Sequence, residues 1–146
     1  MNLTELQDAI VARLGAVTAI TDALGSVPGA YQTHAIYTRV PQSINSEDDA
    51  PFPFVTVSIV APSAFDTKTD TGADVTIDVH VWSRGNTLAV PLGLSDTIYD
   101  ALHRYDLTVS GANVVNCLFE NGTMIMDPDG LTTHVIRTFR VTYFLT

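Results

Sequence analysis

GADVTIDVHVWSR, residues 72–84, is the stretch that decides the fold. Val75, Ile77, Val79 and Val81 share one parity, and Thr76, Asp78, His80 and Trp82 share the other. Alternation with a period of two is typical of a β-strand that has one buried and one accessible face. We therefore predict a long strand here, with Trp82 on the face opposite the core valines.

The end of the chain has the same pattern. Val135, Phe139, Val141, Tyr143 and Leu145 share one parity, which only Arg137 interrupts. Threonines and Arg140 occupy the other parity. We predict a second long strand of the same sheet, with one face toward the core.

Two helices are predicted from apolar residues that recur at helical spacing. The first begins at Asn2, where Glu5 completes a capping-box pattern, and runs to about Leu24. The second covers residues 88–102, with Pro91 in its first turn, where the missing N–H costs little.

The remaining segments are predicted to be short strands and turns. Residues 34–40 are extended, and another strand begins at Phe54 and either ends at Pro62 or is an edge strand there. A meander follows in the last third, with strands at 114–120 and 123–126, a hairpin turn at Asn121-Gly122 and a tight turn at 127–130. These elements predict a single α+β domain over residues 1–146, with two helices on one face of a mainly antiparallel sheet of five or six strands.

Length and composition bound the class of protein. A chain of 146 residues can bury roughly 70% of its unfolded surface, which is enough for a hydrophobic core without disulfides or structural metal ions. Cys117 is the single cysteine, so no internal disulfide is possible, and the sequence has no CxxC motif. The acidic N-terminus is unlike a signal peptide, and no apolar run approaches the ~20 residues of a membrane span. We expect a soluble, unsecreted protein without membrane contact.

The net charge of −9 argues against nucleic-acid binding. A protein that binds nucleic-acid phosphates needs clustered lysine and arginine side chains. Here Lys68 is the only lysine and the six arginines are scattered. Acidity of this kind is typical of simple solubility.

No pattern in the sequence predicts a catalytic, cofactor or metal site. His34, His80, His103 and His134 lie on separate predicted elements without ligand spacing, so we expect isolated histidines. Cys117 lies in an apolar strand pattern and is expected to be a buried structural residue. Asp78 and Arg140 would form a weak cross-strand pair if their strands are neighbours.

Contacts with other proteins are a better hypothesis for function than a catalytic or metal site. The predicted interface consists of Trp82 and of residues in three loops. Trp82 is either an interface anchor or a rim residue under a loop. The long loop at 41–53 carries an acidic triplet, residues 63–73 form a polar and flexible arm, and the predicted hairpin is the third loop. Within them the candidate residues are Glu47, Asp48, Asp49, Phe65, Lys68, Asn121 and Gly122.

The order of these segments carries a resemblance to a known family. The segments concerned are the N-terminal helix, Ile36-Tyr37, Val40-Pro41-Gln42, the acidic loop, residues 53–57, Val79-His80-Val81-Trp82-Ser83-Arg84 leading into a helix with Ile98 and Ala101-Leu102, and residues 127–130 before the strand with Arg137. In this order the chain resembles the tail-completion, or tail-terminator, proteins of long-tailed bacteriophages and gene-transfer particles.

The resemblance implies a structural virion protein rather than an enzyme. Such proteins form a hexameric ring on the last ring of tail-tube subunits, stop tube polymerisation and present the surface that docks the head. The implied partners are copies of the same chain, the tail-tube protein and a head-completion or connector protein, and genomic DNA passes through the lumen without specific binding. The implied location is the head–tail interface of the virion, after synthesis in the host cytoplasm.

Two other functions stay open from the residues alone. A bacterial protein-binding adaptor without ring closure would share every feature described, and a small-molecule enzyme would need a pocket with convergent polar groups. Genomic neighbours would separate these alternatives, because a morphogenesis cluster favours the virion protein.

Overall fold

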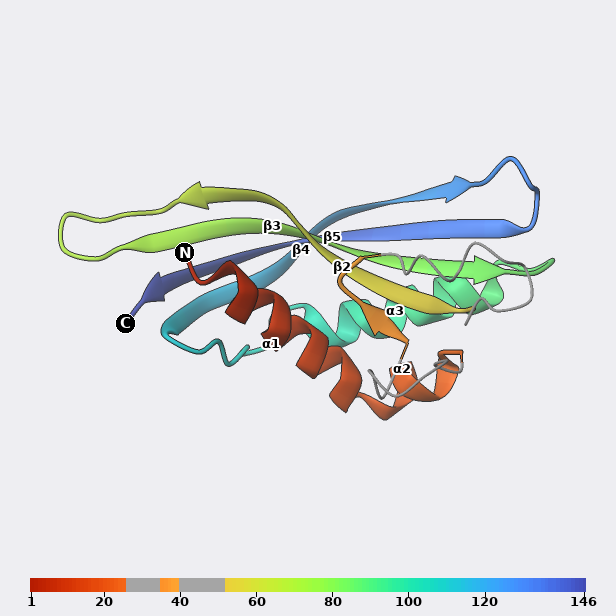
Figure 1. The fold of residues 1–146 in the computed structure, drawn as a ribbon, viewed down its shortest axis with the longest axis horizontal. Coiled ribbons are helices and arrows are strands. Elements are labelled where there is room, and N and C mark those ends of the chain that lie inside the picture. Colours follow the sequence, from red (N-terminus) through yellow and green to blue (C-terminus); the bar gives the residue numbers. More distant parts are fainter. Residues whose placement is uncertain (26–34, 40–51) are drawn as a thin grey trace.

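The computed structural model describes residues 1–25, 35–39 and 52–146, and these residues form one layer of helices on one twisted sheet (Figure 1). Within them the sheet has five strands in the order β1-β2-β3-β5-β4, all antiparallel except the β1–β2 pair. The strands are β1 (Ile36–Tyr37), β2 (Phe54–Ala64), β3 (Gly72–Arg84), β4 (Ala112–Met126) and β5 (Thr132–Leu145). The helices are α1 (Leu3–Ala16), α2 (Thr18–Ala23) and α3 (Ala89–Leu102). The predicted α+β class is confirmed.

Strand β3 is the centre of the sheet, as its alternating pattern predicts. It pairs with β2 on one side and, over its whole length, with β5 on the other. Val75, Ile77, Val79 and Val81 are fully buried. The apolar stripes of the helices lie in the same core cluster, and they consist of Leu6, Ile10 and Leu14 of α1 and Leu94, Ile98 and Leu102 of α3.

The first predicted helix is divided in two. The chain is extended at Val17, with φ −91° and ψ 108°, and α2 then turns Ile20 into the core. The predicted capping box is wrong, because the Asn2 side chain donates instead to the carbonyl of Ser110 at 3.0 Å. Helix α3 confirms the second prediction, with Pro91 in its first turn. In the described part of the chain no helix has the length and apolarity required to cross a membrane.

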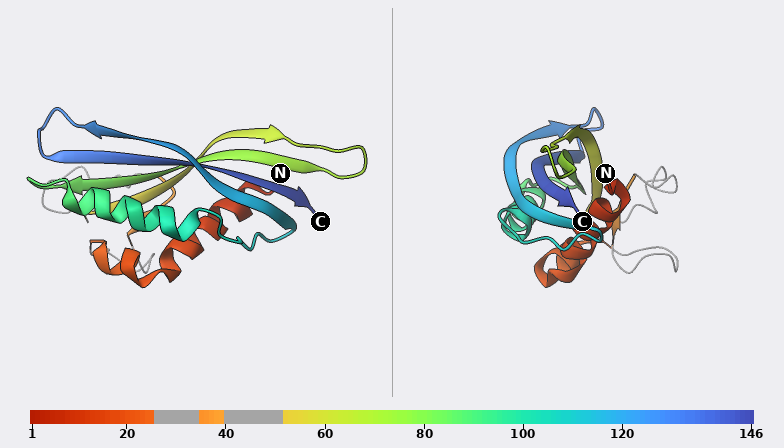
Figure 2. Two further views of the ribbon diagram at one scale, coloured as in Figure 1. Left: turned by 180° about the vertical axis from the view of Figure 1, so that it is seen from behind. Right: turned by 90° about the vertical axis from the view of Figure 1, so that its left-hand side faces the viewer.

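Two long hairpins extend toward opposite ends of the sheet (Figure 1). The end-on view in Figure 2 shows how strongly the sheet is twisted and curved between them. We call the β2–β3 hairpin with its turn, residues 60–74, the first arm, and the β4–β5 hairpin beyond Glu120, residues 121–136, the second arm. Strand β2 runs through Pro62, so the predicted strand end there is wrong and the edge-strand alternative is right, since β1 covers only Val55 and Thr56.

The predicted hairpin turn at Asn121-Gly122 is wrong. Strand β4 is continuous through both residues, which pair with Thr138 and Arg137 of β5. The register shifts between Phe119 and Asn121, which makes Glu120 the extra residue of a β-bulge. The chain reverses later, at the predicted tight turn, where the Gly130 N–H donates to the Asp127 carbonyl at 3.0 Å.

Candidate functional site

The sheet face opposite α1 and α3 carries an aromatic row at one end. Phe54, Trp82, His134 and Ile125 are direct cross-strand partners, one from each of the strands β2, β3, β5 and β4. The Trp82 ring stacks on His134 with 3.7 Å between ring centroids and on Phe54 with 5.9 Å. The Trp82 indole N–H donates to the Thr56 hydroxyl at 3.3 Å. Trp82 is therefore a half-buried member of this row and not a freely exposed anchor.

The row brings together two histidines that were expected to be isolated. His80 Nδ1 and His134 Nε2 are hydrogen-bonded, which corrects that expectation. Sequence spacing misses the pair because it joins β3 to β5 across 54 residues. Burial lowers the pKa of both rings, and the neighbouring His80 helps to lower the pKa of His134 to about 4. Both rings are consequently neutral at pH 7.

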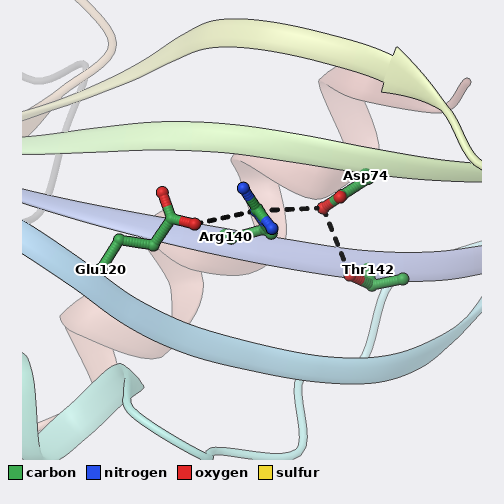
Figure 3. Close-up of polar contacts among 4 residues, drawn as sticks. All are labelled: Asp74, Glu120, Arg140 and Thr142. Carbon is green, nitrogen blue, oxygen red and sulfur yellow. Dashed lines mark hydrogen bonds and ion pairs between the residues drawn. The ribbon is translucent and has the colours of Figure 1, made fainter.

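The opposite end of the same face is ionic (Figure 3). The Arg140 guanidinium lies 2.9 Å from the Glu120 carboxylate and 3.6 Å from that of Asp74, and the Thr142 hydroxyl donates to Asp74 at 3.3 Å. The predicted Asp78–Arg140 pair is wrong, since Asp78 accepts a hydrogen bond from the Thr138 hydroxyl at 2.7 Å. The β-bulge at Glu120 supplies the carboxylate that sequence reasoning missed.

The first arm is a defined hairpin, not the flexible segment that its composition predicts. Its turn is closed by the Thr67 N–H, which donates to the Asp70 carbonyl at 2.8 Å, and by the Asp66 carboxylate, which accepts from the Gly72 N–H at 3.0 Å. The Phe65 ring packs on Phe144 with 5.7 Å between centroids and is still about half exposed, at 48%. Lys68 is exposed in the turn.

The second arm exposes large apolar side chains. Met124, Ile125, Met126 and Leu131 are 43–58% exposed. Their signal in the sequence is the run Met124-Ile125-Met126 beside the turn, which the prediction assigned to a short returning strand. Asn121 and Gly122 lie at the base of this arm, inside β4.

The acidic triplet and Cys117 are the remaining residues singled out by the sequence. Glu47, Asp48 and Asp49 lie outside the described residues. Cys117 is buried, as predicted, and its burial raises the pKa of the thiol to about 12, so the reactive thiolate is not available at neutral pH. Within the described residues no group of three or more His, Cys, Asp or Glu side chains is placed to hold a metal ion.

The sequence of the chain matches the family described as tail completion protein gp17 over residues 8–143. The chain belongs to this tail completion family. It is 33% identical, over 94 residues that cover 64% of the chain and 69% of the relative, to the tail completion protein gp17 of Bacillus phage SPP1. In fold it is similar to a chain in the virion of a native gene transfer agent particle, with a TM-score of 0.72, 21% identity and coverage of 95% and 94% of the two chains.

Membership of the tail completion family decides the class of function. The chain is a structural protein of the virion tail and not an enzyme. The enzyme alternative is thereby removed, and the features of interest are surfaces that contact other proteins. As a tail completion protein the chain offers two arms at opposite ends of the sheet, together with the face that joins them (Figure 1).

Proposed function

We propose that this tail completion protein forms a ring at the head-proximal end of the tail tube, stops tube polymerisation and provides the surface on which the head docks. Six copies are the expected number. The observation that carries the proposal is the family match over residues 8–143. The tail-tube protein and a head-completion or connector protein are the expected neighbours.

The shape of the subunit supports closure into a ring. A ring of identical subunits uses heterologous contacts, in which one surface meets a different surface of the next copy. The two arms differ in chemistry: the first carries Phe65 and Lys68 beside polar turn residues, and the second carries apolar side chains. A subunit with unlike arms at opposite ends can reach a different neighbour with each.

The interface candidates follow from this arrangement. Phe65 and Lys68 on the first arm, Asn121 and Gly122 at the base of the second, and the rim of the aromatic row at Trp82 are proposed contact residues, together with Glu47, Asp48 and Asp49. We also propose that carboxylates face the lumen, because like charge lets DNA pass without phosphate contacts.

The test is a mass measurement with and without the cognate tail-tube protein. Native mass spectrometry, paired with electron microscopy of tube length, should detect a six-fold species that appears alone or on tube ends and stops their growth. A monomer that leaves tube length unchanged at every ratio would refute the terminator function and favour an adaptor without ring closure.

A further inference from the structure

The outer edge of β4 is divided into a capped half and an open half. In the capped half, the loop after α3 satisfies the outward backbone groups: the Arg104 N–H donates to the Cys117 carbonyl at 2.7 Å, and the Phe119 N–H donates to His103 Nδ1 at 3.0 Å. The cap ends at Phe119, next to the bulge at Glu120. The residues of β4 after Glu120 belong to the second arm.

In the open half, three residues direct their backbone away from the sheet. The Asp127 N–H donates to the Thr132 carbonyl at 2.9 Å, across the hairpin. Because bonded and non-bonded pairs alternate along antiparallel strands, Gly122, Met124 and Met126 present their N–H and C=O groups outward. Among residues 1–25, 35–39 and 52–146, no hydrogen bond reaches these groups.

The other edge of the sheet is blunted where it runs along the first arm. The register of β2 against β3 shifts at Val60. The Phe65 N–H donates to the Gly72 carbonyl at 3.0 Å, so by the same alternation the backbone of Pro62 faces outward. Proline has no N–H, so it offers no donor to another chain there. Proteins blunt exposed edges with bulges and prolines because an open edge pairs with other chains. The open half of β4 contains no proline, and the β-bulge of β4 at Glu120 lies before this half begins.

The side chains beside the open edge are apolar, with carboxylates at its turn end and the Arg137 guanidinium beside Gly122 at its other end. Met124 and Met126 lie on one face of the arm and Ile125 on the other, and all three are exposed. Asp127 and Asp129 stand at the turn beside them. Backbone and hydroxyl donors of Leu131 and Thr132 hold the Asp129 carboxylate in its ionised form.

We propose that residues 122–126 of β4 bind an extended segment of another protein by strand addition, and that this segment is apolar with lysine or arginine where it meets Asp127 and Asp129. Main-chain pairing supplies affinity and the side chains supply selectivity. A second copy of this chain is a poor occupant, because it carries a net charge of −9 and its own β2 edge is blunted at Pro62.

The experiment uses the full chain with short synthetic peptides in which valine alternates with lysine, and with matched peptides in which valine alternates with glutamate. Hydrogen exchange followed by NMR should show new protection at the amides of Gly122, Met124 and Met126 with the lysine peptide only. The amides of Thr123 and Ile125, which already face β5, should not change.

Matched variants distinguish pairing with the β4 edge from nonspecific peptide binding. Met124→Pro removes one outward N–H and no β4–β5 bond, so the lysine peptide should bind at least about fivefold more weakly, the factor expected for one hydrogen bond. Val60→Thr changes a similarly exposed residue on the blunted edge, 54% exposed, and should bind as wild type. Asp127→Asn, which removes only a charge at the turn, should reduce the preference for the lysine peptide.

Four outcomes would overturn the proposal. They are the absence of binding by any peptide, binding that leaves the 122–126 amides unprotected, wild-type affinity in Met124→Pro, and protection that appears with protein concentration in the absence of peptide. The last outcome would identify a second copy as the occupant.

Discussion

Phe139 is one of the largest fully buried side chains of the core. Its side chain is fully buried and meets the Phe119 ring edge-on, with 5.6 Å between centroids. Phe139→Ala should lower the free energy of unfolding by about 3–5 kcal/mol, because it removes a large apolar contact and leaves a cavity. Urea unfolding measures the loss. Phe65→Ala, on the first arm, is the control, and an equal loss in both variants would contradict this account.

The histidine pair should make stability depend on pH. His134 has a pKa of about 4 in the folded protein, below its ordinary value of 6.5, because burial and the neighbouring His80 outweigh the attraction of Asp127. The unfolded chain therefore binds more protons between these values. This contribution to stability is complete above pH 6.5 and is lost as the pH falls toward 4.

The measurement is urea unfolding at several pH values between 7 and 4.5, for the wild type and for His134→Gln. Carboxylates titrate in both proteins, so the difference between the two curves isolates the histidine. The wild type should lose more stability on acidification than the variant. Parallel curves would contradict the lowered pKa of His134 in the folded protein.

Two glycines of different elements should respond oppositely to alanine. A Cβ at Gly122 in β4 would lie 2.6 Å from an Arg137 nitrogen and 2.8 Å from the Ile136 carbonyl oxygen. Gly122→Ala should therefore destabilise the protein by about 1–3 kcal/mol, the range for overpacking. A Cβ at Gly93 in α3 meets nothing within 4 Å, so Gly93→Ala should stabilise by about 0.5–1 kcal/mol through helix propensity.

Thermal unfolding of the two variants measures whether each substitution lowers or raises the stability of the protein. If Gly122 were a hairpin turn residue, as its sequence predicts, the clash with Arg137 would not exist. A neutral Gly122→Ala variant would thus contradict the continuous strand.

Elements could be predicted from the sequence where their signal is repeated over many residues. Period-two alternation identified β3 and β5, and the buried valines and Phe139 lie where it predicts. The Asn121-Gly122 signal is local, and pairing of β4 with β5 along most of their lengths overrides it. The helix break at Val17 follows Gly15 by two residues, but a single glycine inside a helical pattern does not by itself predict a break, and burial of Ile20 accounts for it only in the folded structure.

The candidate surfaces were harder to predict than the elements. Trp82 was correctly placed opposite the core, but its stacking on His134 depends on the β3–β5 register, which no spacing in the sequence encodes. The Arg140–Glu120 ion pair depends on a bulge, and a bulge has no reliable signature in one sequence. The open edge of the second arm is visible only once the hydrogen bonds of β4 are known.

Charge acts on the whole molecule. Each copy carries −9, so copies brought together in the proposed ring repel one another. Added salt shortens the screening length from about 30 Å at 0.01 M to about 8 Å at 0.15 M ionic strength. Ring formation should therefore strengthen as salt is raised over this range.

Light scattering or native mass spectrometry at several salt concentrations, with tube ends present, measures the effect. The double variant Asp96→Asn and Asp100→Asn removes two exposed charges from α3 without touching either arm, and it should assemble at lower salt than the wild type. Assembly that weakens as salt rises would mean that ion pairs between subunits, of the kind that Lys68 can make, outweigh the overall repulsion. That result would direct attention to the first arm as the electrostatic contact of the ring.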